Sequence, residues 1–400
     1  MRRTYSIGVY FLGIKGILRK NKIIYSLNAK IKAFLMVQKL EYLNKKYDRL
    51  VPHYSLTDQQ VEDLFKEKIK PRLKNKNDKF NVFWVGANHS QDYSGFAQAL
   101  EKLTNFYFFK NVKNEYGLEF TSAFYDPNLV KRNSEALRSQ IDSLNTSGVQ
   151  IDLILGQMWA NYISPDTLSK LRDEGHIVIN ISMDDRLPEL WDRRGNYQLG
   201  AAGLAKSVDL TLTTSPECCK RFYYHGGLAL FWPLASDPDI FHPDKKKYDV
   251  SFVGNKYGIR EKIITALTEA GIEVEAFGAG WKNGSIASDK VAEVFNSSKI
   301  ILGIGTIGHC EDVYTLKLRD FDATMTGALY ITHRNPDLLK IFDEDRDIVC
   351  YSTEKELVEK VKYYLKNPDL AEEAGNCAAK KARQHHTWNA RLSHLLSLLS

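Results

Sequence analysis

The chain has 400 residues, of which 44% are hydrophobic and 26% charged, so two globular domains are expected. Its five cysteines include no C-x-x-C pair, which argues against a zinc site or a disulfide framework and favours free thiols in a reducing compartment. The net charge of +6 comes from residues 1–80, with 19 Lys+Arg against 7 Asp+Glu, while the other 320 residues carry 36 against 42. Because the body is acidic and the basic part lacks an aromatic platform, we expect no nucleic-acid partner.

Residues 1–79 are predicted to form a basic helical extension. The apolar run 5–14 is too short to span a bilayer and is followed by lysines rather than a cleavage site, so it is neither a membrane span nor a signal peptide. Further on, apolar residues recur at helical spacing and predict a helix over 24–50: Met36, Leu40, Leu43, Tyr47 and Leu50. Many lysines flank this helix. Residues 1–50 therefore either pack on the protein's own body or lie on an anionic membrane surface.

A second helix is predicted after the first. Thr57 and Gln60 have the spacing of a capping box, and Pro71 is expected to end that helix.

Two successive runs of short apolar strands and helices follow, which predicts an α/β protein with two Rossmann-like domains. The first domain is expected over 80–235, with strands at 81–86, 118–125, 151–157, 177–183 and 208–213. A linker rich in proline and lysine covers 236–247. The second domain is expected over 248–384, with strands at 248–254, 272–277, 300–303, 328–332 and 347–351, and a C-terminal helix over 385–400.

Polar residues follow the strands of the first domain, at the edge where parallel sheets bind ligands. His89 comes after the first strand and Asp184 after the fourth, and these two are the candidate catalytic residues. The Asp184–Asp185 pair could act as a base, bind a divalent ion, or simply begin the next loop as turn and cap residues.

Glycines and cations follow the strands of the second domain, a combination that suits a diphosphate. The turn at Gly254 is not a G-x-G-x-x-G and no P-loop pattern occurs, so dinucleotide and P-loop sites are not supported there. Trp281 could stack on a base or plug the domain. Asp322, within a helix predicted over 319–326, could bind ribose hydroxyls or pair with Arg319 on the surface. The candidate donor-binding residues are Gly254, Lys256, Arg260, Gly280, Trp281, Gly305, Thr306, Lys317, Arg319 and Asp322.

Several stretches resemble the spore maturation protein CgeB family: YDVSFVGNKYGIR (248–260), KLRDFD (317–322), GALYIT (327–332), HTWNAR (386–391) and, more loosely, VDLTLTTS (208–215). That family consists of glycosyltransferases with the GT-B fold, whose two Rossmann-like domains face a cleft, and its C-terminal domain is similar to that of family 4. The resemblance covers about residues 80–391 and implies a nucleotide-diphosphate sugar in the second domain and an acceptor in the first. It also implies that Asp322 stands where the family commonly has a ribose-binding glutamate. Tyr314 stands where related enzymes have a second glutamate near the sugar.

The resemblance implies a hexosyltransferase that uses a nucleotide sugar and a glycan, lipid-linked or cell-surface acceptor. Lys256, Arg260, Lys317 and Arg319 would neutralise the departing diphosphate, so no metal and no other cofactor is expected. We expect a cytoplasmic protein, with the basic extension as a candidate attachment to the inner face of the membrane. Two alternatives stay open at this point: a catalytically silent GT-B protein that binds or assembles glycans, and a nucleotide-sugar epimerase.

Overall fold

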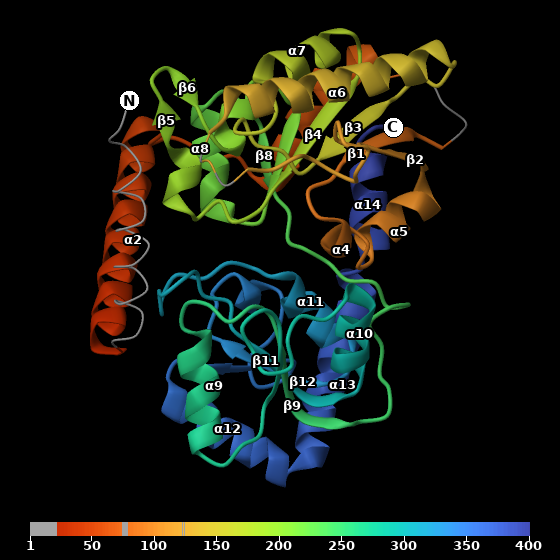
Figure 1. Ribbon diagram of the computed structural model, residues 1–400. Coiled ribbons are helices and arrows are strands. Elements are labelled where there is room, and N and C mark those ends of the chain that lie inside the picture. Colours follow the sequence, from red (N-terminus) through yellow and green to blue (C-terminus); the bar gives the residue numbers. More distant parts are fainter. Residues whose placement is uncertain (1–21, 74–78, 122, 124) are drawn as a thin grey trace, which may run out of the picture.

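The computed structural model describes residues 22–73, 79–121, 123 and 125–400, and it shows two parallel-sheet domains, one above the other (Figure 1). The first sheet has the order β2 (Asn105–Phe108), β1 (Asn81–Val85), β3 (Leu153–Gly156), β4 (Ile177–Ser182), β7 (Leu210–Thr213) and β8 (Ala229–Phe231). The second has the order β10 (Glu275–Phe277), β9 (Tyr248–Val253), β11 (Ser298–Gly303), β12 (Leu329–His333) and β13 (Val349–Tyr351).

Helices cover both sheets, and the remaining elements are short. The first domain holds α4 (His89–Asp92), α5 (Phe96–Leu103), α6 (Pro127–Thr146), α7 (Pro165–Asp173) and α8 (Cys219–Tyr224). The second holds α9 (Arg260–Glu269), α10 (Ser288–Asn296), α11 (Leu318–Met325), α12 (Glu354–Lys366) and α13 (Pro368–His385). The short elements are η1 (Lys70–Arg72), η2 (Pro188–Trp191), η3 (Ala201–Leu204), η4 (Pro216–Cys218), η5 (Leu338–Lys340) and the pair β5 (Arg193–Arg194) and β6 (Tyr197–Gln198).

The last helix returns to the first domain. α14 (Trp388–Ser397) packs on α5, and the rings of Phe96 and Trp388 lie edge to face with centroids 5.2 Å apart. Residue 388 therefore belongs to the contact between the domains, although it follows the second domain in sequence.

The central strands are buried on both faces, which is why the alternation of apolar strands and helices could be recognised in the sequence. Every residue of β4 and of β12 is buried, as expected for strands that are covered on both faces. The prediction for 118–125 was wrong in its described part, which contains no strand, since Leu118 makes a single backbone bond to Gly86. The edge strands β2 and β8 were not predicted.

The extension contains two long helices, as predicted. α2 (Lys22–Leu50) corresponds to the helix expected over 24–50, and α3 (Asp58–Ile69) ends before Pro71. The capping box is present, with Gln60 N donating to Thr57 Oγ1 at 3.3 Å and Thr57 N donating to Gln60 Oε1 at 2.9 Å. The apolar run 5–14 lies outside the described residues.

Beyond α3, a buried ion pair ties the extension to the first domain. Arg72 donates to both carboxylate oxygens of Asp209, at 2.9 and 2.8 Å. All five cysteines are free, as predicted. In the described part of the chain, no helix has an apolar stretch long enough to cross a bilayer.

Candidate functional site

Two arginine side chains meet at the carboxyl end of β9. Arg260 begins α9 and Arg319 lies in the first turn of α11, and their guanidinium carbons lie 5.6 and 4.6 Å from the centroid of the Phe252 ring. Arg260 Nη1 donates to the carbonyl oxygen of Asn255 at 2.8 Å, and Arg319 Nε donates to that of Val253 at 2.9 Å. The end of one strand therefore orients both cations.

Gly254 allows this close approach. Its φ is +154°, and a Cβ atom there would lie 2.6 Å from Arg319 Nη2 and 3.1 Å from Arg260 Nη1. Its carbonyl oxygen accepts a hydrogen bond of 2.7 Å from Trp281 Nε1. Any larger residue would displace the guanidinium groups, so glycine at this position is a requirement of the site.

The two cations have no counter-ion within the described residues, where no carboxylate pairs with either arginine. Arg260 is buried, and burial together with the charge of Arg319 lowers the pKa of Arg260 to about 10. Arg319 Nη1 is buried and has no hydrogen-bond partner. Burying a cation without a counter-ion is unfavourable, and the N-terminus of α11 adds further positive potential, so the arrangement favours an anion.

A carboxylate that the sequence analysis did not single out caps α11. Asp320 Oδ2 accepts from Lys317 N at 2.7 Å, and its Oδ1 accepts from Tyr330 Oη at 2.5 Å. The signal was available, because an acid three residues after a helix start commonly caps it. Asp320 therefore fixes the turn that presents Arg319.

Asp322 lies deeper in the same helix. It is 6% exposed, and its Oδ1 accepts a hydrogen bond of 2.7 Å from Ser236 Oγ in the linker. Burial raises the pKa of Asp322 well above the usual range for a carboxyl group. The alternative of a surface ion pair with Arg319 is wrong, because the carboxyl group is buried and contacts the linker.

Three further predicted residues, Lys256, Gly280 and Trp281, lie beside the turn at Gly254. Lys256 Nζ is 3.0 Å from Glu261 Oε1 and 5.3 Å from the centroid of the Trp281 ring. A Cβ atom at Gly280 would be 3.0 Å from Lys256 Cβ. Lys256 is therefore engaged with a carboxylate and an indole, and Trp281 is anchored to the turn through its nitrogen.

The glycine-rich loop after β11 contains Gly305 and Thr306. The Gly305 carbonyl accepts from Thr315 N at 3.0 Å, and the Thr306 hydroxyl is buried with no hydrogen-bond partner. The loop therefore folds back onto the segment that leads into α11.

Asp184 comes from the first domain and reaches the start of α11. Lys317 Nζ donates to Asp184 Oδ1 at 2.8 Å, and Asp184 has a φ of +60°. Its neighbour Asp185 is a turn residue, buried between the hydroxyls of Ser182 and Thr213 at 2.6 and 2.5 Å. Of the two acids, Asp184 alone faces the second domain.

His89 lies apart from these residues. It is exposed at the start of α4, where its ring stacks on Tyr93 with centroids 4.4 Å apart and meets Tyr116 edge to face at 5.0 Å. None of these contacts brings it to the two arginines.

Arg186, which the sequence analysis did not select, bridges the two domains. It donates to both Glu217 carboxylate oxygens at 2.5 and 2.8 Å, to Asp337 Oδ2 at 2.5 Å and to the Tyr314 carbonyl at 2.7 Å. Its partners are distant in sequence, so no local sequence pattern predicts these contacts.

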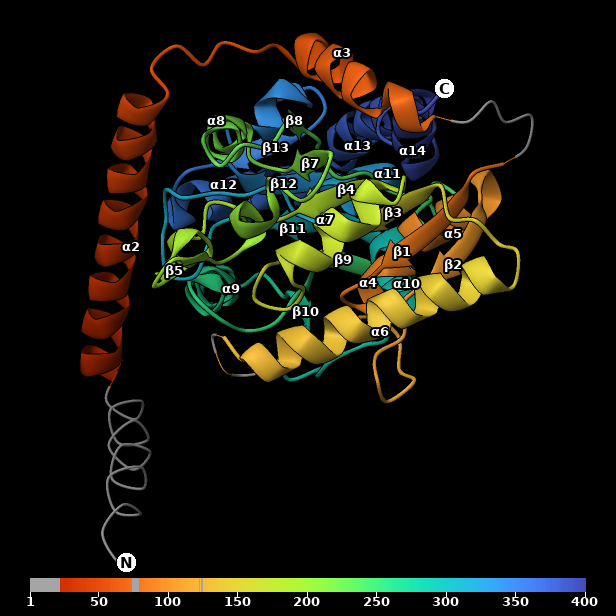
Figure 2. The same ribbon diagram turned by 90° about the horizontal axis from the view of Figure 1, so that it is seen from above.

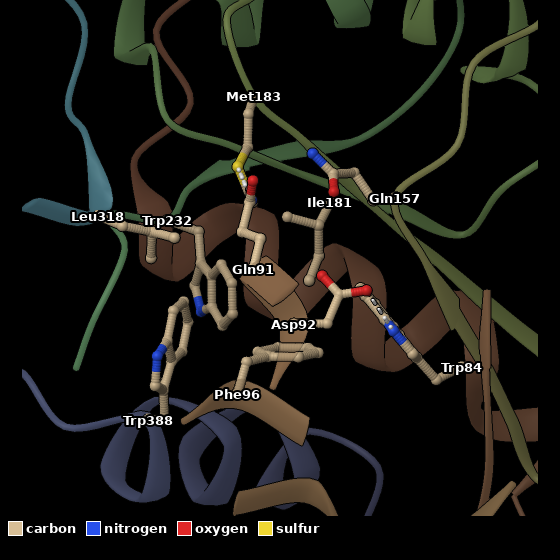
Figure 3. Close-up of a pocket in the computed structure, with 10 residues that line it drawn as sticks. All are labelled: Trp84, Gln91, Asp92, Phe96, Gln157, Ile181, Met183, Trp232, Leu318 and Trp388. Carbon is tan, nitrogen blue, oxygen red and sulfur yellow. Dashed lines mark hydrogen bonds between the residues drawn. The ribbon is translucent and has the colours of Figure 1, made fainter. Parts of the chain in front are cut away.

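A small cavity lies where the first domain meets α14 and the start of α11 (Figure 3). Its volume is about 20 Å³, enough for about one water molecule and too little for a sugar. Trp84 Nε1 and Tyr116 Oη donate to Asp92 Oδ2 at 3.2 and 2.8 Å. The lining residues are Trp84, Gln91, Asp92, Phe96, Gln157, Ile181, Met183, Trp232, Leu318 and Trp388.

Comparisons with known proteins agree with this architecture. Residues 260–397 match a family model described as Glycosyl transferase-like, whereas no curated protein matches the chain. Sucrose-phosphate synthase from Thermosynechococcus elongatus superposes with a TM-score of 0.55 at 12% identity, covering 80% of this chain and 98% of its own. The catalytic domain of starch synthase IV from Arabidopsis thaliana, bound to ADP and acarbose, gives 0.55 at 10% identity, with 80% and 99% covered.

Anabaena HepE in complex with UDP and glucose gives a TM-score of 0.52 at 12% identity, covering 80% of this chain and 100% of its own. The chain has the GT-B fold. This confirms the predicted fold class, including two Rossmann-like domains with helical segments at both ends. The likenesses do not single out the CgeB family, which stays a prediction. Within the GT-B fold, the paired arginines lie on the second domain, at the strand ends that face the first.

Proposed function

We propose that this protein is a glycosyltransferase whose nucleotide-diphosphate sugar donor binds with its diphosphate between Arg260 and Arg319. The observation that carries the proposal is that, within the described residues, no carboxylate forms an ion pair with either of these two cations. The Glycosyl transferase-like match supports it, because residues 260–397 include both arginines and the whole of α11.

The chemistry of sugar transfer requires such a site. When the bond between the sugar carbon and the diphosphate oxygen breaks, negative charge grows on the departing nucleotide. Fixed guanidinium groups and a helix N-terminus stabilise that charge at little reorganisation cost. We propose that Arg260, Arg319 and α11 supply this stabilisation without a metal ion, with Lys317 and Lys256 nearby.

For the acceptor side we propose Asp184 as the group that takes the proton of the acceptor hydroxyl. It comes from the first domain, and its ion pair with Lys317 at 2.8 Å holds it beside the residue that precedes the donor helix. Opening of that pair would free the carboxylate. His89, exposed at the carboxyl end of β1, is the second candidate. The acceptor is proposed to be a glycan, on a lipid carrier or at the cell surface.

One observation favours a second candidate function, a GT-B protein that binds donor without transfer. Tyr314 occupies the position at which related family 4 enzymes are expected to carry a glutamate, and its hydroxyl donates to the Glu311 carbonyl at 2.9 Å. The Glu311 carboxylate does not replace it, because it is 65% exposed and pairs with Lys262 at 2.8 Å.

A ligand screen tests the donor class. The purified protein would be heated with UDP, GDP, CDP, dTDP or ADP, each with and without EDTA. A ligand at about 100 times its dissociation constant adds about 2.7 kcal/mol of stability. We expect one nucleotide to raise the melting temperature whether or not EDTA is present. No shift with any of them would contradict the proposal.

A turnover assay with the matching sugar nucleotide then separates the two functions. Release of free nucleoside diphosphate in the presence of acceptor glycans supports transfer. Binding without release supports the silent protein.

A further inference from the structure

α2 runs beside both domains (Figures 1 and 2), and apolar side chains on one of its faces pack on each of them. Towards the second domain, apolar residues of this inner face cover the loop after β11: Ala33, Met36, Val37 and Leu40 on Ile307, Cys310 and Val313. Towards the first domain, Leu43 and Tyr47 belong to a buried cluster with Trp191 and Phe222. The inner face is therefore fully used by the protein's own body.

Polar contacts fix the C-terminal half of α2 in place. Arg221 Nη2 donates to Asn44 Oδ1 at 2.6 Å, and the Tyr47 hydroxyl lies 2.7 Å from His225 Nε2. The helix therefore has a defined rotation about its axis, and its opposite face is directed outward.

That outer face is apolar as well. Leu27, Ile31, Phe34 and Leu35 are 59%, 49%, 63% and 53% exposed. Their spacing of four, three and one places them on one stripe, and Tyr42, 66% exposed, extends it by two turns. Single exposed apolar residues are ordinary. Four large ones within nine positions of one helix form an apolar patch of the kind that marks an interaction site.

Positive charge surrounds the stripe. Over residues 22–50 there are seven Lys and Arg against two acids, and one of those acids, Asp48, contacts Lys220 of the first domain. Within the described residues, no carboxylate pairs with the lysines of this helix that flank the stripe: Lys30, Lys32, Lys39 and Lys45. In the sequence, residues 1–21 contribute five more Lys and Arg residues and no Asp or Glu.

We propose that the outer face of α2 docks on an anionic membrane surface, with the helix lying in the plane of the interface. An apolar stripe can enter the boundary between headgroups and acyl chains while the lysines on either side contact lipid phosphates. The unpaired lysines favour a membrane over a second copy of this chain as the partner of this face. A second copy would bring the same positive charges face to face. Because the inner face holds both domains, such docking would orient the whole molecule on the membrane.

Vesicle flotation tests this inference on the full chain. We expect co-flotation with vesicles of phosphatidylglycerol and phosphatidylcholine, little with phosphatidylcholine alone, and weaker binding as salt is added. The double substitution Phe34→Ser/Leu35→Ser should lower the partition coefficient at least about tenfold. The matched control is Tyr363→Ser/Leu370→Ser, which removes two apolar residues that are 52% and 42% exposed on the second domain and should leave flotation unchanged.

Several outcomes would overturn the inference. One is equal binding to both kinds of vesicle, or to neither. Another is a Phe34→Ser/Leu35→Ser variant that keeps its melting temperature and floats like the wild type, which would assign binding to another segment such as 1–21. A third is a lipid-free dimer that this variant converts to a monomer, which would make a second copy the occupant.

Discussion

Arg260 and Arg319 hold two like charges against one phenylalanine ring, and the nearness of Arg319 helps to lower the pKa of Arg260 to about 10. Burying the charge of Arg260 and placing it near the like charge of Arg319 are both unfavourable. This arrangement therefore does not stabilise the folded protein. The arrangement therefore fits the proposed anion site, in which stability is given up for binding.

Replacing one of these cations should not destabilise the empty protein. Arg260→Met keeps most of the volume and removes both the desolvation and the repulsion, so we expect an unchanged free energy of unfolding or a gain of about 1 kcal/mol. Urea unfolding measures this. The matched control is Arg72→Met, which removes the bidentate guanidinium partner of the buried Asp209, leaving Lys68 Nζ at 3.5 Å as its cation, and should cost about 3 kcal/mol. Equal losses in both variants would contradict this account of Arg260.

Asp322 should matter for the ribose and not for the phosphates. We expect Asp322→Ala to weaken the binding of the preferred nucleoside diphosphate about tenfold, since we propose that this carboxyl group binds the ribose hydroxyls. Inorganic diphosphate has no ribose, so its affinity should be unchanged. Calorimetric titration of both ligands checks this, with Ser236→Ala as the control that removes the present partner of Asp322. Equal loss for both ligands would show that Asp322 acts on the fold instead.

The buried Asp185 should make stability depend on pH. Burial raises the pKa of Asp185 from 3.8 to about 6, so the folded protein binds this proton more tightly than the unfolded chain does. The resulting stabilisation is complete below pH 3.8 and is lost as the pH rises through about 6. It amounts to about 3 kcal/mol. Asp185→Asn cannot ionise, so the difference in unfolding free energy between wild type and variant should change across this window. A constant difference would refute the assignment.

Arg186 should hold the two domains together. Arg186→Ala leaves the Asp337 carboxylate, 5% exposed, without its guanidinium partner, and should cost about 3 kcal/mol. We also expect a larger radius of gyration by X-ray scattering, because the contacts to Tyr314 and Asp337 cross between domains. Arg346→Ala is the control: this side chain is 74% exposed, so its loss should change stability by less than about 0.5 kcal/mol. A compact and fully stable Arg186→Ala protein would argue against the bridge.

Local patterns were enough to predict the repeated fold and to select the two arginines that the structure brings together. Buried strands such as β4 and β12 are continuous apolar runs, and Gly254 followed by Lys256 and Arg260 marks a strand that ends at a helix start. The capping box at Thr57 was likewise visible, because both of its partners lie within one turn.

Contacts between distant segments could not be predicted in this way. The pair of Asp184 with Lys317 and the bridge from Arg186 to Asp337 join residues 133 and 151 positions apart, and only the docking of the domains creates them. The orientation of Asp322 depends on Ser236 in the linker for the same reason. In α2, the sequence indicated one apolar face, whereas the structure shows a second on the opposite side.

The most direct test of the central claim is a calorimetric titration of inorganic diphosphate and of the preferred nucleoside diphosphate. It would compare the wild type, Arg260→Met, Arg319→Met and the exposed control Arg346→Met. The account predicts that each of the first two substitutions weakens both ligands at least about tenfold, since a charge-assisted contact to the diphosphate is lost, while the control binds like the wild type. Unchanged affinity in Arg260→Met and Arg319→Met, with both proteins folded, would contradict it.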